Sequence, residues 1–270
     1  MKLSAREYLG IGDSYEARMA FLVEAGYDGI EITGRPDLLE VVGEIAEASR
    51  ATGCAVSTIC SGGRGALLAA ERDQRDLAMA DLRSFLTAAA QLGATGVIYA
   101  PLIAVKMNPE QFTRLPDLGP LSSQQELEME LLVRLAGDLA AHAEGLGVCV
   151  LWEPLNRYEQ WWFNRLEHGA ALCDRVVSEG CKVMADLFHM SIEEDSIPDA
   201  LRQYGEQYVR HVHLADSNRA SPGHGHTDFA AAFGALREVG FDGYLALECS
   251  PRGDKAKDLK RCAEFLRSLV

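Results

Sequence analysis

The sequence predicts an α/β protein: a single (β/α)8 TIM barrel that occupies residues 1–270 as one domain. Three observations lead to this fold class. Strand-like and helix-like segments alternate along the whole chain, eight such repeats fit the length, and no linker rich in Pro, Gly or Ser divides it. An open doubly wound sheet would need a Gly-rich phosphate turn after its first strand, and Y-L-G-I-G-D-S lacks the third glycine of that motif.

The expected strands are short apolar runs between turn signals. Seven are clear, and an eighth is expected within the first ten residues. The seven runs are 28–33, 54–60, 95–101, 147–153, 181–187, 208–216 and 243–249.

The segments between these runs have helical periodicity. They cover 14–25, 36–52, 68–92, 122–146, 164–179, 228–239 and 254–268, with a shorter helix near 197–204 after Pro198. In the segment 122–146, Ser122 and Gln125 predict a capping box, a leucine stripe marks the buried face, and the helix is expected to end near Gly145. The longest irregular stretch, 102–121, is expected to form part of the wall of an active site.

The composition narrows the classes of function. A formal net charge of −14 argues against a nucleic-acid partner, because such proteins gain affinity from Lys and Arg. The sequence has no apolar run long enough for a membrane span and no secretory h-region at its N-terminus, so we expect a cytoplasmic protein with no membrane partner. The seven cysteines are scattered, with no C-x-x-C pair, and are expected to be reduced, buried thiols.

Four consecutive expected strands finish in ionisable residues. Glu153 ends the fifth strand, Asp186 the sixth and Glu248 the eighth, and His213 lies near the end of the seventh. Each is about one strand–helix repeat from the next, so a barrel would bring all four to one patch at its C-terminal rim. A single residue of this kind is usually a solvated strand end, but four in register are harder to explain in that way.

Three carboxylates gathered at one patch repel one another unless a cation lies between them. A divalent metal ion is the simplest solution, and three oxygen ligands with one imidazole suit Mn²⁺ first, with Mg²⁺ or Co²⁺ as alternatives. His211 points the same way as His213 along its strand and is expected one layer deeper, as a structural group.

Four stretches of the second half together resemble a known family of enzymes: E-P-L-N-R-Y-E at 153–159, D-L-F-H-M at 186–190, H-V-H-L-A-D-S-N-R at 211–219 and the glutamate of L-A-L-E-C. They look like the metal-dependent ketose 3-epimerases of the D-tagatose and D-psicose type, within the xylose-isomerase-like barrel superfamily. The first half resembles that superfamily only in its general pattern, including G-Y-D-G-I-E-I.

This resemblance implies that one divalent ion is bound by Glu153, Asp186, His213 and Glu248. It also implies that Glu159, His189 and Arg219 bind the sugar. The activity it implies is C3 epimerisation of a keto-sugar through a cis-enediolate, with Glu153 and Glu248 as the acid/base pair. A homo-oligomer, either dimer or tetramer, is implied as well.

Several alternatives stay open. The sequence C-S-P-R after Glu248 and the segment 220–229 depart from the epimerase pattern, which leaves the sugar undetermined. A hydroxypyruvate isomerase, an aldose–ketose isomerase or an inosose-type enzyme would use nearly the same ligands, and an abasic-site endonuclease is a remote alternative. Trp161, Trp162, His224 and His226 follow the motifs closely without an assigned role.

Overall fold

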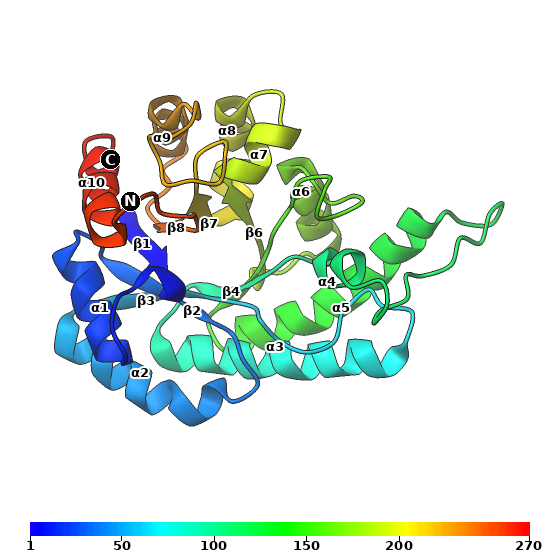
Figure 1. Ribbon diagram of the computed structural model, residues 1–270. Helices are drawn as coiled ribbons and strands as arrows, with labels where there is room; N and C mark the ends of the chain where they lie inside the picture. Colours follow the sequence, from blue (N-terminus) through cyan, green and yellow to red (C-terminus); the bar gives the residue numbers. More distant parts are fainter.

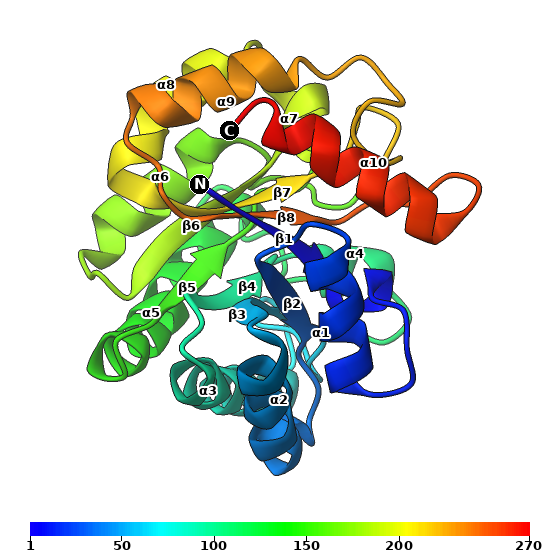
Figure 2. The ribbon, with the colours of Figure 1, turned by 90° about the vertical axis from the view of Figure 1, so that its left-hand side faces the viewer.

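The computed structural model describes residues 1–270 and contains one closed barrel of eight parallel strands in the order β1 to β8, with β1 paired to β8. Helices surround the strands, and the two termini lie near each other (Figures 1 and 2). The strands are β1 (Lys2–Arg6), β2 (Gly29–Thr33), β3 (Ala55–Cys60), β4 (Gly96–Tyr99), β5 (Cys149–Trp152), β6 (Cys181–Asp186), β7 (Val209–Leu214) and β8 (Tyr244–Leu247). The predicted fold class is confirmed, including the eighth strand near the N-terminus.

Ten α-helices and one short 3₁₀ helix connect the strands. They are η1 (Glu7–Leu9), α1 (Tyr15–Glu24), α2 (Leu38–Thr52), α3 (Arg72–Leu92), α4 (Ile103–Met107), α5 (Gln124–Gly145), α6 (Leu166–Val176), α7 (Leu187–Glu193), α8 (Ile197–Tyr208), α9 (Phe229–Glu238) and α10 (Lys255–Arg267). None of the helices combines the length and apolar character that a membrane-crossing segment needs.

Several helices differ from the prediction at their ends: α3 begins at Arg72 rather than 68, and α6 ends at Val176 rather than 179. The cap of α5 is Ser123 rather than Ser122, and Glu126 rather than Gln125 completes the capping box. Glu126 is the better partner because its carboxylate accepts from the backbone N–H of Ser123. Helix α8 continues to Tyr208, four residues beyond the prediction, and is followed directly by β7 at Val209.

Two short helices were not predicted, and both lie where the chain leaves a strand. Helix α4 interrupts the stretch 102–121, and the rest of that stretch extends away from the barrel in Figure 1. Helix α7 begins directly after Asp186, whose carboxylate accepts hydrogen bonds from the backbone N–H groups of Phe188 and His189. The same side chain therefore ends a strand and caps a helix.

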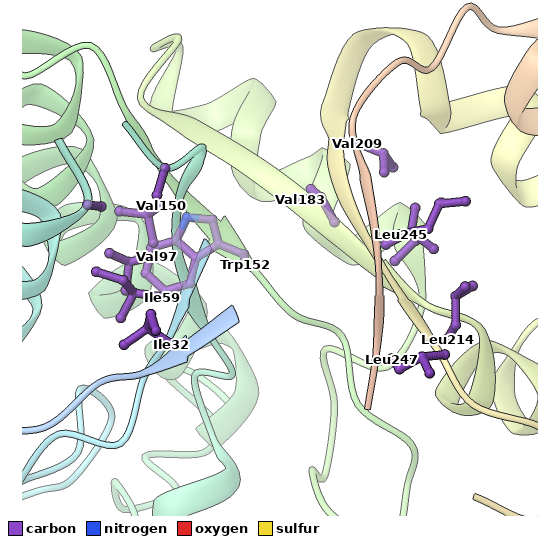
Figure 3. Packing of buried hydrophobic residues seen from close by; sticks show 14 of the residues in the cluster. Ile32, Ile59, Val97, Val150, Trp152, Val183, Val209, Leu214, Leu245 and Leu247 are labelled. Atoms are coloured by element: carbon purple, nitrogen blue, oxygen red, sulfur yellow. The ribbon is translucent and has the colours of Figure 1, made fainter. Parts of the chain in front are cut away.

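The largest apolar core lies between the strands and the helices. Figure 3 shows part of it in two groups, one from β2 to β5 and one from β6 to β8. Strand residues whose side chains point to the other face of the sheet form a separate, smaller cluster: Ile98, Cys149, Leu151 and Met184. Because side chains alternate along a strand, this second set faces the inside of the barrel, and positions 153 and 186 continue its parity.

Candidate active site

The side chains of Glu153, Asp186, His213 and Glu248 meet inside the C-terminal end of the barrel. One ligand atom of each lies within 4.8 Å of those of the others. His213 Nδ1 is at the centre: it is 3.6 Å from Glu153 Oε1, 3.8 Å from Asp186 Oδ2 and 3.3 Å from Glu248 Oε2. The four strands β5 to β8 thus bring together the four residues that the sequence predicts to share a patch.

The chain fixes each of these residues locally. Strand β5 ends at Trp152, and the backbone N–H of Glu153 still bonds to Tyr99 O, so Glu153 keeps the inward direction of the strand before Pro154 ends the ladder. The backbone N–H of Glu248 bonds to Leu214 O in the same way. Asp186 is held by its role as the cap of α7. Each carboxylate therefore projects from rigid backbone rather than from a free loop.

The ring of His213 is oriented from behind by Glu31 of β2. His213 Nε2 lies 3.1 Å from both Glu31 oxygens, and Glu31 is fully buried. Because the Nε2–H donates to this carboxylate, the lone pair of Nδ1 faces the three acidic residues. Thr58 and His211 also contact Glu31, so His211 lies deeper in the barrel and supports the carboxylate that orients His213.

The buried charges shift the pKa values of this group in different directions. Burial raises the pKa of Glu153, with a further contribution from Glu248. Burial also disfavours the charged form of Glu248, but His213, Arg219 and Arg6 outweigh it and hold its pKa below the ordinary value. For Asp186, the same penalty is outweighed by Arg219, His189 and His213, and its pKa is held well below the ordinary range.

The donor set fits a divalent metal ion. Glu153 Oε1 and His213 Nδ1 are buried polar atoms with no hydrogen-bond partner in the protein, although such atoms are nearly always paired. A cation in contact with both would satisfy them together with Asp186 and Glu248. Three carboxylates and one imidazole are ligands that Mn²⁺, Mg²⁺ or Co²⁺ accept.

A cavity of about 360 Å³ opens above these residues, near the lower limit of typical ligand pockets. Glu153 and Glu248 lie on its floor, and the predicted sugar contacts Glu159, His189 and Arg219 also line it. The remaining wall is formed by Arg6, Leu155, the turn 61–65 and residues 98–104. The expectation that the stretch 102–121 contributes to the wall therefore holds only for its first part, at Ile103 and Ala104.

The side chain of His189 is positioned by Asn156, which the sequence did not single out. The backbone N–H of Asn156 donates to His189 Nδ1 at 3.2 Å, so His189 Nε2 carries the proton and lies 3.6 Å from Asp186 Oδ2. The side-chain amide of Asn156 also donates to Glu159 Oε1 at 2.9 Å. One buried asparagine thus connects two of the predicted sugar contacts.

Arg219 reaches the acidic group from a tight turn after β7. Its Nη1 lies 2.7 Å from Asp186 Oδ2, its Nη2 contacts Glu248, and its guanidinium stacks on Phe188 at 4.6 Å. The backbone of Arg219 has a φ of 60°, a conformation that is uncommon outside glycine. The carboxylate of Asp216 stabilises this loop by accepting from the backbone N–H groups of Ser217, Gly223 and Thr227.

Sequence reasoning missed Glu31 and Arg6. Glu31 had one signal, a carboxylate inside an apolar strand, and Arg6 is the corresponding charge at the end of β1. The residues without an assigned role lie away from the cavity. Trp162 is buried against Glu128, Trp161 is partly exposed, and His224 pairs with Asp258 on α10.

These features define a class: a (β/α)8 barrel with a carboxylate–histidine cluster, whose donor atoms fit a metal ion, at the C-terminal end of its strands. Residues 19–269 match the model of a family described as Xylose isomerase-like TIM barrel. The chain belongs to this family, as the resemblance predicted.

Several curated relatives are similar over different shares of the chain. The 3-dehydro-D-guloside 4-epimerase of Escherichia coli is 28% identical over 275 residues, which cover 99% of this chain and 100% of that protein. A D-psicose 3-epimerase of Ruminiclostridium cellulolyticum is 36% identical over 121 residues, 45% of this chain and 41% of that protein. Epimerases are isomerases, so the prediction of an enzyme of this class is confirmed.

Solved structures agree with these relatives. The structure of a 3-keto-D-glucoside 4-epimerase from E. coli is similar with a TM-score of 0.88 at 28% identity, covering 99% of both chains. A D-psicose 3-epimerase from Clostridium cellulolyticum H10, solved with D-tagatose, has a TM-score of 0.84 at 21% identity and covers 100% of this chain and 99% of that one. At that identity the second likeness shows the shared fold.

Proposed function

We propose that this protein is a divalent-metal-dependent epimerase that inverts a carbon next to the carbonyl group of a sugar. The observation that carries the proposal is the placement of two glutamates, the buried Glu153 and the partly exposed Glu248, in the lining of one cavity with Asp186 and His213 beside them. Epimerisation needs a base for the proton of that carbon and an acid that returns a proton to the opposite face. Two carboxyl groups in one small cavity can supply both.

The proposed metal ligands are Glu153, Asp186, His213 and Glu248. A bound ion would supply Lewis-acid polarisation of the substrate carbonyl, which an ordinary glutamate needs before it can remove a proton from carbon. Burial raises the pKa of Glu153, whereas His213, Arg219 and Arg6 outweigh burial at Glu248 and hold its pKa below the ordinary value. These opposite directions favour Glu248 as the base and Glu153 as the acid in one direction. In the reverse direction the two roles exchange.

The predicted sugar contacts have matching tasks in this proposal. The proton on His189 Nε2 and the guanidinium of Arg219 can donate to the oxygens that become negative as the proton leaves carbon. Glu159, held by Asn156, can accept hydrogen bonds from sugar hydroxyls. All three side chains line the cavity that contains the two glutamates.

The carbon that is inverted has two candidates. C3 of a free ketose is the prediction from the sequence motifs. The similarity to the E. coli 3-dehydro-D-guloside 4-epimerase, which spans both chains, favours C4 of a 3-keto sugar as the second candidate. In both substrates the inverted carbon is bonded to the carbonyl carbon, so the same two glutamates serve either reaction.

A deuterium-exchange experiment tests this function. The Mn²⁺-loaded protein is incubated in D₂O with D-fructose, D-psicose, D-tagatose, L-ribulose and methyl 3-keto-D-glucopyranoside, and exchange is followed by NMR. We expect deuterium and the epimer to appear together, at C3 of a ketose or at C4 of the 3-keto glucoside. Glu248→Gln should abolish the exchange, whereas Glu238→Gln, which changes an exposed ion pair with Arg202, should not. Absence of exchange from every sugar, in protein that holds one Mn²⁺ per chain, would contradict the proposal.

A further inference from the structure

Arg6, at the end of β1, is a buried arginine between two carboxylates of the barrel interior. Its Nη1 lies 3.2 Å from Glu31 Oε1 and 3.1 Å from Glu248 Oε1, and only 11% of its side chain is exposed. Neither Nε nor Nη1 makes a well-aligned hydrogen bond, so both contacts are ion pairs. Arg6 also lines the cavity. The guanidinium therefore connects the group that orients His213 with the proposed base.

The two oxygens of Glu248 are held by different arginines. Arg219 contacts Oε2, the oxygen that faces His213, whereas Arg6 contacts Oε1 from the neighbouring strand β1. Arg219 comes from a loop and is itself a proposed sugar contact. Arg6 comes from a strand and is covered by Tyr8, whose ring centroid lies 5.8 Å from the guanidinium carbon. Arg6 is therefore the more rigid of the two supports.

At Glu31, the charge of Arg6 has no substitute. Glu31 is fully buried, and a buried carboxylate without a cation is costly. The neighbouring thiol of Cys60 stays neutral, because burial raises its pKa to about 12. Of the buried groups that Glu31 contacts, Arg6 is the one with a permanent positive charge.

We propose that Arg6 is a positioning residue, which fixes Oε1 of Glu248 so that its other oxygen faces the ligand group and the substrate. This inference rests on the proposed function for its effect on turnover. Its effect on metal binding does not depend on the identity of the substrate.

The test uses full-length Arg6→Met, Arg6→Lys and Arg6→Ala proteins, with Arg35→Met as the matched control. Arg35 follows β2 and pairs with Glu7 and Asp37, outside the cavity. Two quantities are measured: the dissociation constant of Mn²⁺, from the electron paramagnetic resonance of free Mn²⁺, and kcat and KM on a sugar that the wild type epimerises. Thermal melting with circular dichroism confirms that each variant is folded.

We expect Arg6→Met to weaken Mn²⁺ binding or turnover by about 10- to 100-fold, the usual effect of removing a group that supports a metal ligand. The loss should fall on kcat more than on KM, because the proton transfer depends on the direction of Glu248. Arg6→Lys should lose less Mn²⁺ affinity and less turnover than Arg6→Met, because it keeps the positive charge. Some loss should remain, because a lysine cannot bridge two carboxylates with a planar fork. Millimolar guanidinium should restore part of the activity of Arg6→Ala, a result that a purely structural role would not give.

Three outcomes are distinguishable. If Arg6→Met keeps kcat and the Mn²⁺ dissociation constant within about twofold of wild type, the inference is wrong even though the proposed function stands. If the wild type epimerises none of the sugars, the proposed function fails, and the Mn²⁺ dissociation constants of Arg6→Met and Arg35→Met still decide the role of Arg6. If Arg6→Met does not fold, Arg6→Lys and the rescue of Arg6→Ala by guanidinium carry the decision.

Discussion

Replacing Glu31 by glutamine should weaken metal binding although Glu31 is not a proposed ligand. The oxygens of Glu31 accept hydrogen bonds from His213 Nε2 and the Thr58 hydroxyl, and His211 Nε2 and Arg6 Nη1 lie 3.0 Å and 3.2 Å from them. An amide has one oxygen and one NH₂ group, so a glutamine must place a donor against a donor in a fully buried position. The substitution also removes the charge that fixes the tautomer of His213.

The size of this effect follows from the geometry. A buried donor left without an acceptor costs about 1–3 kcal/mol, and loss of the carboxylate behind a ligand histidine reduces metal affinity by about 10- to 100-fold, or about 1.4–2.7 kcal/mol. Titration of wild type, Glu31→Gln and Glu7→Gln with Mn²⁺ measures this loss of affinity. Glu7 is the control because it is buried and accepts from Arg18 and from the backbone N–H of Thr33, but does not contact His213. Equal affinity of Glu31→Gln and wild type would refute this reasoning.

Three further predictions concern stability. Ser123→Ala should lower the free energy of unfolding by about 1 kcal/mol because it removes the cap of α5, whereas Ser122→Ala should lower it by only about a few tenths. Urea unfolding of the two variants measures both losses, and the reverse order would contradict the assigned cap. Phe233→Ala should lower the free energy of unfolding by about 3–5 kcal/mol because this ring is fully buried. A loss below about 1 kcal/mol would show that the position is loosely packed. Burial alone would raise the pKa of Asp258, but hydrogen bonds from Ser221, His224 and the backbone N–H of Arg252 hold it well below the ordinary value. The stability that Asp258 contributes should therefore be present in full above about pH 4 and be lost at more acid pH. The difference in unfolding free energy between wild type and Asp258→Asn should shrink as the pH falls below 4. A difference independent of pH would show that the ionised carboxylate of Asp258 does not stabilise the fold in this way.

The strands and the shared patch could be predicted because both depend on local pattern. Glu153, Asp186, His213 and Glu248 each follow or end an apolar run, and a parallel barrel brings the ends of its strands together. The cap of α5 could not be resolved in this way. Two adjacent serines each have a suitable residue three positions later, and only the structure shows that Glu126 reaches back to Ser123.

The roles of Glu31 and Arg6 could not be predicted from the sequence, because their contacts form only in the closed barrel. Glu31 lies 182 residues before His213 in the sequence, and a strand glutamate within an apolar run has no local signal that names its partner. Arg6 meets Glu248 only because β1 pairs with β8 and closes the sheet. The contacts that orient ligands are thus long-range consequences of topology, whereas the ligands themselves follow a repeat in the sequence.

The most direct test of the central claim is the position of bound metal. Crystals of the Mn²⁺-loaded protein, measured at the manganese absorption edge, would give an anomalous difference map. We predict a single peak in contact with Glu153, Asp186, His213 and Glu248. A second group of residues, Glu31, His211 and His213, also has ligand atoms close enough to bind an ion. A peak there, or no peak in protein that retains the ion in solution, would contradict the assignment.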